Sequence, residues 1–425
     1  MPSPRQDLAA RLLGADARLW GVALSADRED MVRMREVLRE SGVGPGQVVG
    51  LAGLPGPELL VAIAAVWAVD AVPRPSTEGA PPARCHYALS PTGLLESGED
   101  LPLEHDATAL LHATSGSSAV AKVARRSVAS VLQEANGYRE GLGLCPADRI
   151  SVPVPVAHSF GSGVALSALL SGCDVYADNK RLPSALAADM DGGLLNKVAV
   201  TPSLGQLLAR TRRSGTCTVD AVLVGAGVLA EGLSEELADR FGVKVTVGYG
   251  STETGGTFIG SSGIGAPIAG VDVVWPETGQ EGQLVLRTVT PVLGYMNEAP
   301  RTSPIWRTAD IVVREAPSAV RYVRRVSDDR IRLNGSFVNV APLREAAERI
   351  PGVSEHAFVV APEQRSAGVE ALYLVLASAI LTPPALARQL RWRGPPVRVV
   401  TCRSLPRNGM GKLDRAALVQ MVRAA

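Results

Sequence analysis

Short apolar runs alternate with stretches whose apolar residues recur every three or four positions along much of the chain. QVVGLAG (47–53) suits a buried strand, and PELLVAIAAVWAVDAVP (57–73) suits a helix packed on it. The alternation returns between residues 149 and 250, with AVLVGAG (221–227), EGLSEELADRFG (231–242) and KVTVGYG (244–250) as one unit. Strand, helix, strand order predicts parallel sheets joined by crossover helices, and therefore a large α/β architecture.

The pattern changes twice towards the C-terminus. VDVVWPETGQEGQLVLRT (271–288) reads as two strands around a turn, which predicts a β-rich subdomain. Beyond residues 325–329, strand-like runs flank a helix at APLREAAERI (341–350), and a glycine-rich loop leads into a last helix. We therefore expect a small α+β unit of about 100 residues after the large α/β part.

The charge balance narrows the range of partners. Lys and Arg total 43 against 42 Asp and Glu, a net charge of +1. Such a chain has no long-range attraction for nucleic acid or anionic lipid, so neither is expected as a partner and a charged ligand must be held by local groups. Five dispersed cysteines without a CxxC pair argue against a disulfide framework and against a zinc site.

The apolar stretches do not suggest a membrane protein. The most apolar one, residues 59–69, is too short to cross a bilayer and reads as a buried helix. The first residues, MPSPRQDLAARLLG, contain no apolar run of the signal-peptide type. From these features we expect a soluble cytoplasmic protein.

Two motifs carry groups suited to a nucleotide. ATSGSSAVAKVARRS (113–127) places small hydroxyl residues, a glycine and a lysine after an apolar strand, which suits a polyphosphate but is no Walker loop. A serine-rich surface turn is the alternative. In VGYGSTETGG (247–256) a tyrosine ring suits a flat base and Glu253 suits magnesium. Alternatively, Thr252 and Glu253 simply cap a following helix.

Two later motifs are weaker by themselves. Asp310 in WRTAD (306–310) is either a ribose ligand or an ordinary surface or capping group. Lys412 in PRNGMGKLDR (406–415) follows two glycines, so it is either a mobile cation that reaches an active site or a solvated lysine on a surface loop.

In this order, over nearly the whole chain, the motifs resemble those of the adenylate-forming superfamily: acyl-CoA synthetases, peptide-synthetase adenylation domains and firefly-type luciferases. YGSTE and GKLDR are the most specific parts. The resemblance implies an N-terminal core at 1–327, abbreviated at its start, and a mobile C-terminal domain at 328–425. It implies an AMP-forming ligase that converts a small carboxylic acid and Mg-ATP into an acyl-adenylate and pyrophosphate. The acyl group then passes to a thiol, either coenzyme A or the phosphopantetheine arm of an acyl or peptidyl carrier protein.

The resemblance also implies roles for individual residues. Lys412 bridges the carboxylate and the α-phosphate, Glu253 holds magnesium and Asp328 is the hinge. His158, in PVAHSFGSG, is the substrate gate, and GYMNEAP leads up to the ribose-binding Asp310. The remaining nucleotide ligands carried over are Thr114, Ser115, Gly116, Ser117, Ser118, Lys122, Gly225, Ala226, Gly227, Tyr249, Gly250, Ser251, Thr252 and Arg325.

The sequence departs from the family pattern in the phosphate loop. Ala119 replaces a glycine, Ala121 a proline and Val123 a glycine. The Cβ of Ala119 restricts close backbone approach to phosphate, which predicts weaker use of ATP. Ala309 also replaces a glycine, and Arg325 lies one position from the expected arginine, where Val326 stands.

The altered loop motivates a second hypothesis, a non-catalytic descendant that binds a nucleotide or acyl group as a scaffold or regulator. Retention of Lys122, Glu253, Asp310 and Lys412 argues against it. The acid itself is not identified, because the expected pocket segments 158–164, 224–227 and 246–250 are small and apolar. They contain no charged residue that would demand an amino acid's ammonium group.

Overall fold

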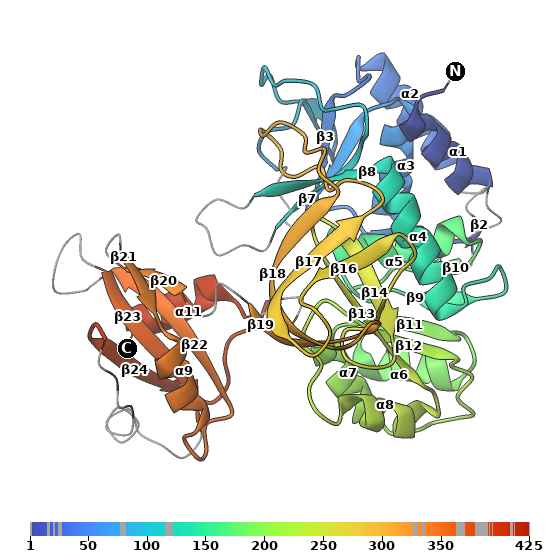
Figure 1. Ribbon diagram of the computed structural model, residues 1–425. Helices are drawn as coiled ribbons and strands as arrows, with labels where there is room; N and C mark the ends of the chain where they lie inside the picture. Colours follow the sequence, from blue (N-terminus) through green and yellow to red (C-terminus); the bar gives the residue numbers. More distant parts are fainter. Residues whose placement is uncertain are drawn as a thin grey trace. The chain divides into compact units, whose positions relative to one another are not determined.

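A computed structural model describes residues 2–14, 18–19, 22–23, 28–76, 82–114, 122–325, 330–333, 336–362, 370–378, 390, 392, 394–408, 411 and 413–424. The chain forms two compact units (Figure 1). The first unit comprises Met1–Thr308 with Val313–Tyr322, and the second comprises Ala309–Val312 with Val323–Ala425. The domain boundary expected between residues 327 and 328 lies outside the described residues and stays a prediction.

A nine-stranded sheet is the centre of the first unit, in the order β15-β14-β13-β12-β11-β9-β10-β1-β2. Its six middle strands, from β13 to β1, are parallel, and the pairs at both ends are antiparallel. All residues of β11 and β12 are buried, as expected for a parallel sheet covered on both faces. The strands are β1 Arg18–Leu19, β2 Val22–Ala23, β9 Arg149–Ser151, β10 Asp174–Tyr176, β11 Lys197–Val200, β12 Ala221–Val224, β13 Val245–Ser251, β14 Gly255–Gly260 and β15 Ala266–Pro267.

Helices form two apolar clusters in this unit. Helix α5 is buried along residues 161–169 and packs against α4, β10 and β14. A separate cluster joins α6, α7 and α8 to strands β11, β12 and β13. The helices are α4 Val128–Leu142, α5 Ser159–Leu170, α6 Pro183–Asp191, α7 Pro202–Ala209 and α8 Leu233–Phe241.

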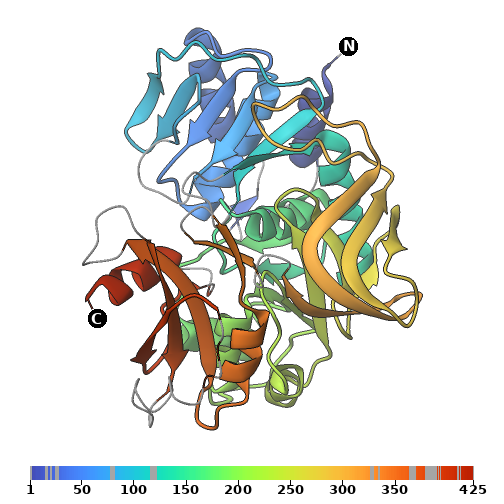
Figure 2. The same cartoon turned by 60° about the vertical axis from the view of Figure 1, so that its left-hand side comes forward.

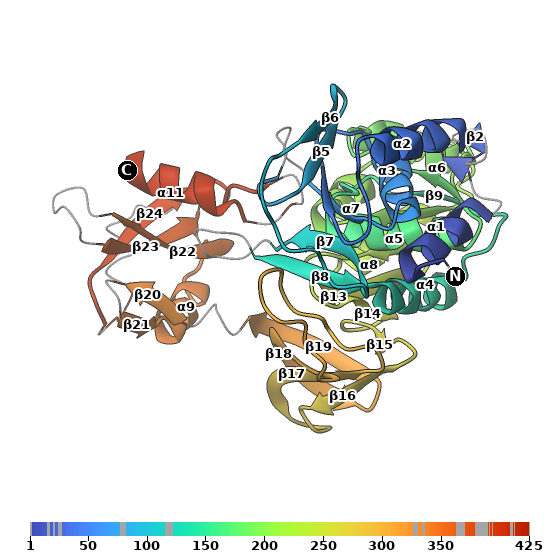
Figure 3. The ribbon, with the colours of Figure 1, turned by 90° about the horizontal axis from the view of Figure 1, so that it is seen from above.

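A second sheet, in the order β4-β3-β5-β6, lies near the N-terminus and is parallel except at β6. Helices α1 and α2 pack against the buried helix α3, as the view from above shows (Figure 3). Trp67 of α3 is fully buried and donates its indole N–H to the Ala109 carbonyl at 2.6 Å. The elements are α1 Pro4–Gly14, α2 Arg28–Glu40, α3 Gly56–Ala68, β3 Val48–Leu51, β4 Val72–Pro75, β5 Tyr87–Ser90 and β6 Gly93–Glu96.

Two antiparallel parts complete the first unit, except that Ala309–Val312 of β18 and residues 323–325 of β19 belong to the second unit. β7 (Thr108–Ala113) and β8 (Val123–Ser127) pair across the predicted phosphate loop. The curved sheet of β16–β19, yellow to orange in Figure 2, contains the two strands predicted around Pro276. Its strands are β16 Val271–Trp275, β17 Glu281–Thr288, β18 Ile305–Ala316 and β19 Ala319–Arg325.

The second unit combines small sheets with helices, so the mixed α/β class expected from the sequence is confirmed. β22 pairs antiparallel with β23, β23 pairs parallel with β24, and α11 packs on β22. Its elements are β20 Arg330–Leu333, β21 Ser336–Asn339, α9 Ala341–Glu348, β22 Glu355–Pro362, β23 Glu370–Ala377, β24 Val397–Cys402 and α11 Arg415–Ala424.

Proline determines where strand β9 ends and where helix α7 begins, and both positions differ from those that the apolar pattern indicates. The run RISVPVPV reads as one strand, but β9 stops at Ser151 because Pro153 and Pro155 have no N–H for a ladder. Likewise, α7 begins at Pro202, earlier than its apolar pattern indicates. The Thr201 hydroxyl caps this helix by accepting the Leu204 N–H at 3.4 Å.

Two further features bear on the sequence expectations. All five cysteines are free thiols; Cys85 and Cys173 are buried, whereas Cys145 is exposed. Among the helices that the structure describes, none has the length and hydropathy to cross a membrane.

Candidate active site

The YGSTE motif forms the turn between β13 and β14. The alternative in which Thr252 and Glu253 cap a helix is therefore wrong, because the chain returns as an antiparallel strand. A Cβ at Gly250 would collide with the Gly255 carbonyl, and one at Gly255 would collide with the Arg126 guanidinium. Gly255 also has a φ of 72°. Glycine at these two positions therefore permits a tight turn, with Glu253 in the turn between the two strands.

Hydroxyl groups brace this turn. The Ser251 amide donates to Thr254 Oγ1 at 3.2 Å, and the Thr254 hydroxyl donates to the Gly255 carbonyl at 2.9 Å. Ser251 Oγ also lies 3.1 Å from Thr254 Oγ1. Ser251, predicted as a nucleotide ligand, thus has a structural contact in this turn, while Thr252 and Glu253 are half-buried at its tip.

A buried ion pair holds the first residues of β14. Arg126 at the end of β8 contacts Glu134 of α4 at 2.9 Å, and their side chains are 2% and 4% exposed. The other Glu134 oxygen accepts the Gly256 N–H at 2.6 Å. We call Arg126, Glu134 and Gly256 the β14 clamp. Because each charge has a partner, the pair tolerates burial and fixes where the YGSTE turn returns.

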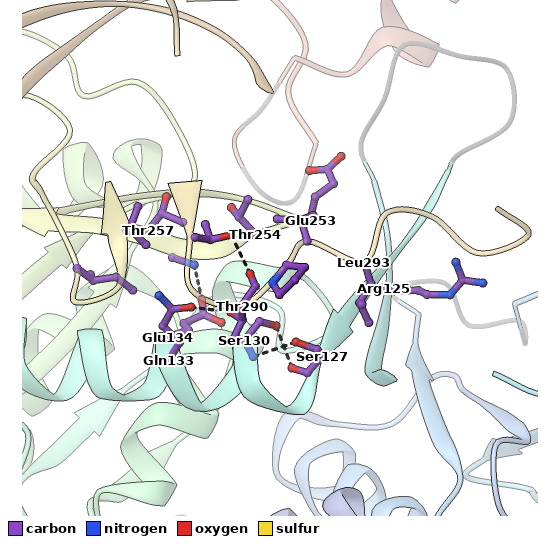
Figure 4. A pocket seen from close by; sticks show the side chains of 16 residues that line it. Arg125, Ser127, Ser130, Gln133, Glu134, Glu253, Thr254, Thr257, Thr290 and Leu293 are labelled. Carbon is purple, nitrogen blue, oxygen red and sulfur yellow. Dashed lines mark hydrogen bonds between the residues drawn. The ribbon is translucent and has the colours of Figure 1, made fainter. Parts of the chain in front are cut away.

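A pocket with both polar and apolar lining residues lies beside the β14 clamp, between α4 and residues 288–293 (Figure 4). Gln133 Oε1 accepts the Thr290 hydroxyl at 2.7 Å across it. Glu253 borders the pocket but points away from Glu134. Of the predicted site residues that the structure describes, Glu253 alone lines this pocket.

Lys122 and Glu253 meet at one tyrosine. The Tyr295 hydroxyl donates to Glu253 Oε1 at 2.7 Å, and the Lys122 ammonium lies 4.6 Å from the centroid of the same ring. The predicted phosphate-binding lysine and magnesium-binding carboxylate are therefore brought together by the tertiary structure. Tyr295 was not among the predicted site residues, although its segment GYMNEAP was noted as part of the resemblance.

The residues predicted around adenine lie on β13 and on the segment directly after β12. The Tyr249 ring meets Phe258 edge-on, with centroids 5.6 Å apart, and is half-buried. Gly225 has no room for a side chain because a Cβ would collide with the Phe160 ring. Ala226, between Gly225 and Gly227, has a φ of 63°. Strained backbone of this kind is frequent in ligand-binding segments, and the role of this segment beside adenine stays a prediction.

His158 is the N-cap residue of α5, and a second, buried histidine lies near it. The His158 carbonyl accepts the Ser162 N–H at 2.9 Å. Ser162 Oγ in turn lies 3.1 Å from Nε2 of His112, which is 1% exposed. Burial, then the positive charge of Arg126 and then His158, lower the pKa of His112 to about 3. His112 is therefore a neutral side chain that supports the first turn of the helix carrying His158.

Asp310 and Arg325 belong to the second compact unit. They form an ion pair of 3.2 Å in which the Asp310 side chain is 11% exposed and the Arg325 side chain is 50% exposed. The predicted ribose carboxylate and the predicted arginine are thus neighbours.

The phosphate loop is described only at its two ends, where the Thr114 N–H donates to the Lys122 carbonyl at 2.7 Å. The described residues contain no group of three or more potential metal-ligating side chains. Magnesium in phosphate sites needs only one or two carboxylates beside the phosphates and water, so Glu253 fits such an ion. The predicted residues Ser115, Gly116, Ser117, Ser118, Asp328 and Lys412 lie outside the described residues.

The chain is similar to known proteins in sequence and in fold. A family model described as "AMP-binding enzyme" matches residues 94–296. A probable 2-succinylbenzoate–CoA ligase of Mycobacterium tuberculosis is 27% identical over 77% of this chain and 87% of its own length. A dimodular nonribosomal peptide synthase of Bacillus subtilis is 25% identical over 92% of this chain, which spans only 19% of that protein.

The fold is shared with solved structures at lower sequence identity. ATP-bound MatB from Rhodopseudomonas palustris superposes with a TM-score of 0.73 at 18% identity, over 98% of both chains. The resemblance therefore extends to the architecture of both compact units.

Proposed function

This chain belongs to the adenylate-forming superfamily, and from that premise we propose that it is an AMP-forming ligase that activates a small carboxylic acid and transfers its acyl group to a thiol. The observation that supports the proposal most is the junction of Lys122, Glu253 and Tyr295. A cation and a carboxylate, each in contact with one ring, provide separate groups for a polyphosphate and for its magnesium ion.

The proposed first step joins two anions. A carboxylate oxygen of the acid attacks the α-phosphorus of ATP, the bond to the β-phosphate oxygen breaks, and pyrophosphate leaves with its electrons. Lys122 would hold the β- and γ-phosphates, Glu253 would hold magnesium, and Lys412 would bridge the carboxylate and the α-phosphate. A magnesium ion bound by Glu253 would supply positive charge to the phosphates. The lysines act because fixed cations lower the repulsion between the two anions as they meet.

In the proposed second step a thiolate sulfur attacks the acyl carbon, and AMP leaves as the carbon–oxygen bond breaks. We propose that the C-terminal domain turns at Asp328 between the two steps and withdraws Lys412, so that one site serves both. The acceptor is coenzyme A or the phosphopantetheine of a carrier protein. The named relatives support both, since one is a CoA ligase and the other a peptide synthase.

Acid-dependent exchange of labelled pyrophosphate into ATP tests the first step. A panel of aryl, branched and straight-chain acids should contain at least one that stimulates exchange clearly above the acid-free rate. Transfer of that radiolabelled acid to coenzyme A or to a purified carrier protein then identifies the acceptor. No exchange with any acid, together with no binding of ATP by calorimetry, would contradict the proposal.

The altered phosphate loop supports one alternative, a non-catalytic nucleotide- or acyl-binding descendant. Ala119 places a side chain where close backbone approach to phosphate is expected. The same measurements separate the two functions, because a non-catalytic descendant binds a ligand without exchange.

A further inference from the structure

Tyr295 holds two oppositely charged groups at different parts of one side chain. Its hydroxyl contacts Glu253 Oε1 at 2.7 Å, and its ring contacts the Lys122 ammonium at 4.6 Å from the centroid. In the described part of the chain, Lys122 and Glu253 form no direct ion pair with each other. The tyrosine therefore gives the carboxylate and the ammonium group one uncharged partner each, so both keep their charge available for a ligand.

The position of Tyr295 follows from backbone pairing with β8. Ala124 and Tyr295 form an antiparallel bridge, and the Met296 amide donates to the Val123 carbonyl at 2.8 Å. Lys122 lies two residues before Ala124, so both side chains are on the same face of the strand and Lys122 is diagonal to Tyr295. A diagonal neighbour is within reach of an aromatic ring and a long side chain, which explains the cation–π contact.

Side-chain contacts keep this pairing rigid. Arg125 donates to the carbonyls of Tyr295 and Glu298, the latter at 2.9 Å, and is itself paired with the buried Glu104 at 2.6 Å. The Arg125 amide donates to the Gly294 carbonyl at 2.9 Å, and Gly294 has a φ of 84°. The tyrosine is thus fixed from β8, which begins directly after Lys122, whereas Glu253 approaches from the turn between β13 and β14.

We propose that Tyr295 is a positioning residue that keeps Lys122 and Glu253 apart and separately available for a nucleotide polyphosphate and its magnesium ion. This role rests on the proposed function of the same site. Without the hydroxyl, Glu253 loses the hydrogen bond that orients its carboxylate, and its second oxygen is no longer presented to a cation. Without the ring, Lys122 loses its support and is free to pair with Glu253, so both groups are withdrawn from the ligand.

Two substitutions separate the hydroxyl from the ring. Tyr295→Phe keeps the ring and should raise the Mg²⁺ concentration that half-saturates pyrophosphate exchange by about tenfold, since a hydrogen bond to a charged group is lost. The KM for the acid should stay unchanged. Tyr295→Leu removes both contacts, so it should also weaken binding of ATP without magnesium, by a few-fold. Tyr87→Phe is the matched control, because its hydroxyl donates to the Ser41 carbonyl at 3.0 Å, away from these residues.

Calorimetry gives a readout that is independent of turnover. Wild type, Tyr295→Phe and Tyr87→Phe are titrated with ATP in the presence and absence of Mg²⁺. Of the three proteins, we expect Tyr295→Phe alone to lose the gain in ATP affinity that Mg²⁺ confers. Equal gains in all three proteins would overturn the role of Tyr295. If wild type binds Mg-ATP but exchanges pyrophosphate with no acid, the proposed activity fails while the tyrosine is still tested.

Discussion

Arg126 and Glu134 form a buried ion pair of 2.9 Å, and the second Glu134 oxygen accepts the Gly256 amide. One carboxylate thereby links β8, α4 and the start of β14, three elements that converge at the YGSTE turn. The pair matters less for net stability than for geometry, because desolvation offsets much of the attraction between two buried charges. Removing one partner is different, because the other charge stays buried and uncompensated.

The substitution Glu134→Gln should therefore destabilise the protein by about 3–5 kcal/mol. Urea unfolding measures the effect. The control is Asp7→Asn, which breaks an exposed ion pair of 2.9 Å with Arg11 and should cost no more than about 0.5 kcal/mol. Equal unfolding midpoints for the two variants would show that the β14 clamp does not hold the turn.

His112 should make stability depend on pH. Its pKa is about 3 in the folded protein, lowered first by burial, whereas the unfolded chain has the ordinary value of 6.5. Between these values the unfolded state binds a proton that the folded state does not, so stability is full above pH 6.5 and falls as the pH is lowered. The slope is about 1.4 kcal/mol per pH unit.

Replacing His112 by glutamine removes this titration. Unfolding free energies of wild type and His112→Gln, measured from pH 7 to pH 4, should converge as the pH falls, because the wild type alone loses the histidine contribution. Parallel curves would mean that His112 has the same pKa in the folded and in the unfolded protein. Besides burial, the charges of Arg126 and His158 lower the pKa of His112.

Ala226 adopts a left-handed backbone conformation, with a φ of 63°, between two glycines. Ala226→Gly should stabilise the fold by about 1 kcal/mol, since glycine reaches this conformation without the Cβ clash. Ala230→Gly, in the same segment, is the matched control and should destabilise slightly because it only loosens the unfolded chain. Thermal unfolding distinguishes the two signs. Destabilisation of both variants by the same amount would argue against strain at Ala226.

Lys412→Ala should lower adenylate formation by at least about 10²–10³-fold, because a preorganised cation at the reacting anions is lost. Transfer of the acyl group from a supplied acyl-adenylate to thiol should be affected far less, since the proposed mechanism withdraws Lys412 before that step. The exposed Lys244 provides the control variant, Lys244→Ala. Pyrophosphate exchange at the wild-type rate in Lys412→Ala would contradict the proposed role of Lys412 in the first step.

Local sequence information predicted most of the elements but not the shape of the YGSTE segment. Val245 to Tyr249 form a strand as their pattern indicates, yet the residues that follow also suited the cap of a following helix. The choice was made by pairing with β14 and by the Glu134 carboxylate, which lies 122 positions from the Gly256 amide that it accepts. A partner so far away leaves no periodic pattern near the turn.

The sequence by itself determined the order of α/β elements, the glycines required by close backbone approach, and the presence of Lys122, Glu253, Asp310 and Lys412. These follow from local rules, because apolar periodicity and turn chemistry act over a few residues. Only the tertiary structure decided that Lys122 and Glu253 share Tyr295, which is 42 positions from Glu253. That junction depends on the pairing of residues 294–296 with β8, and pairing between distant segments is set by packing of the whole unit.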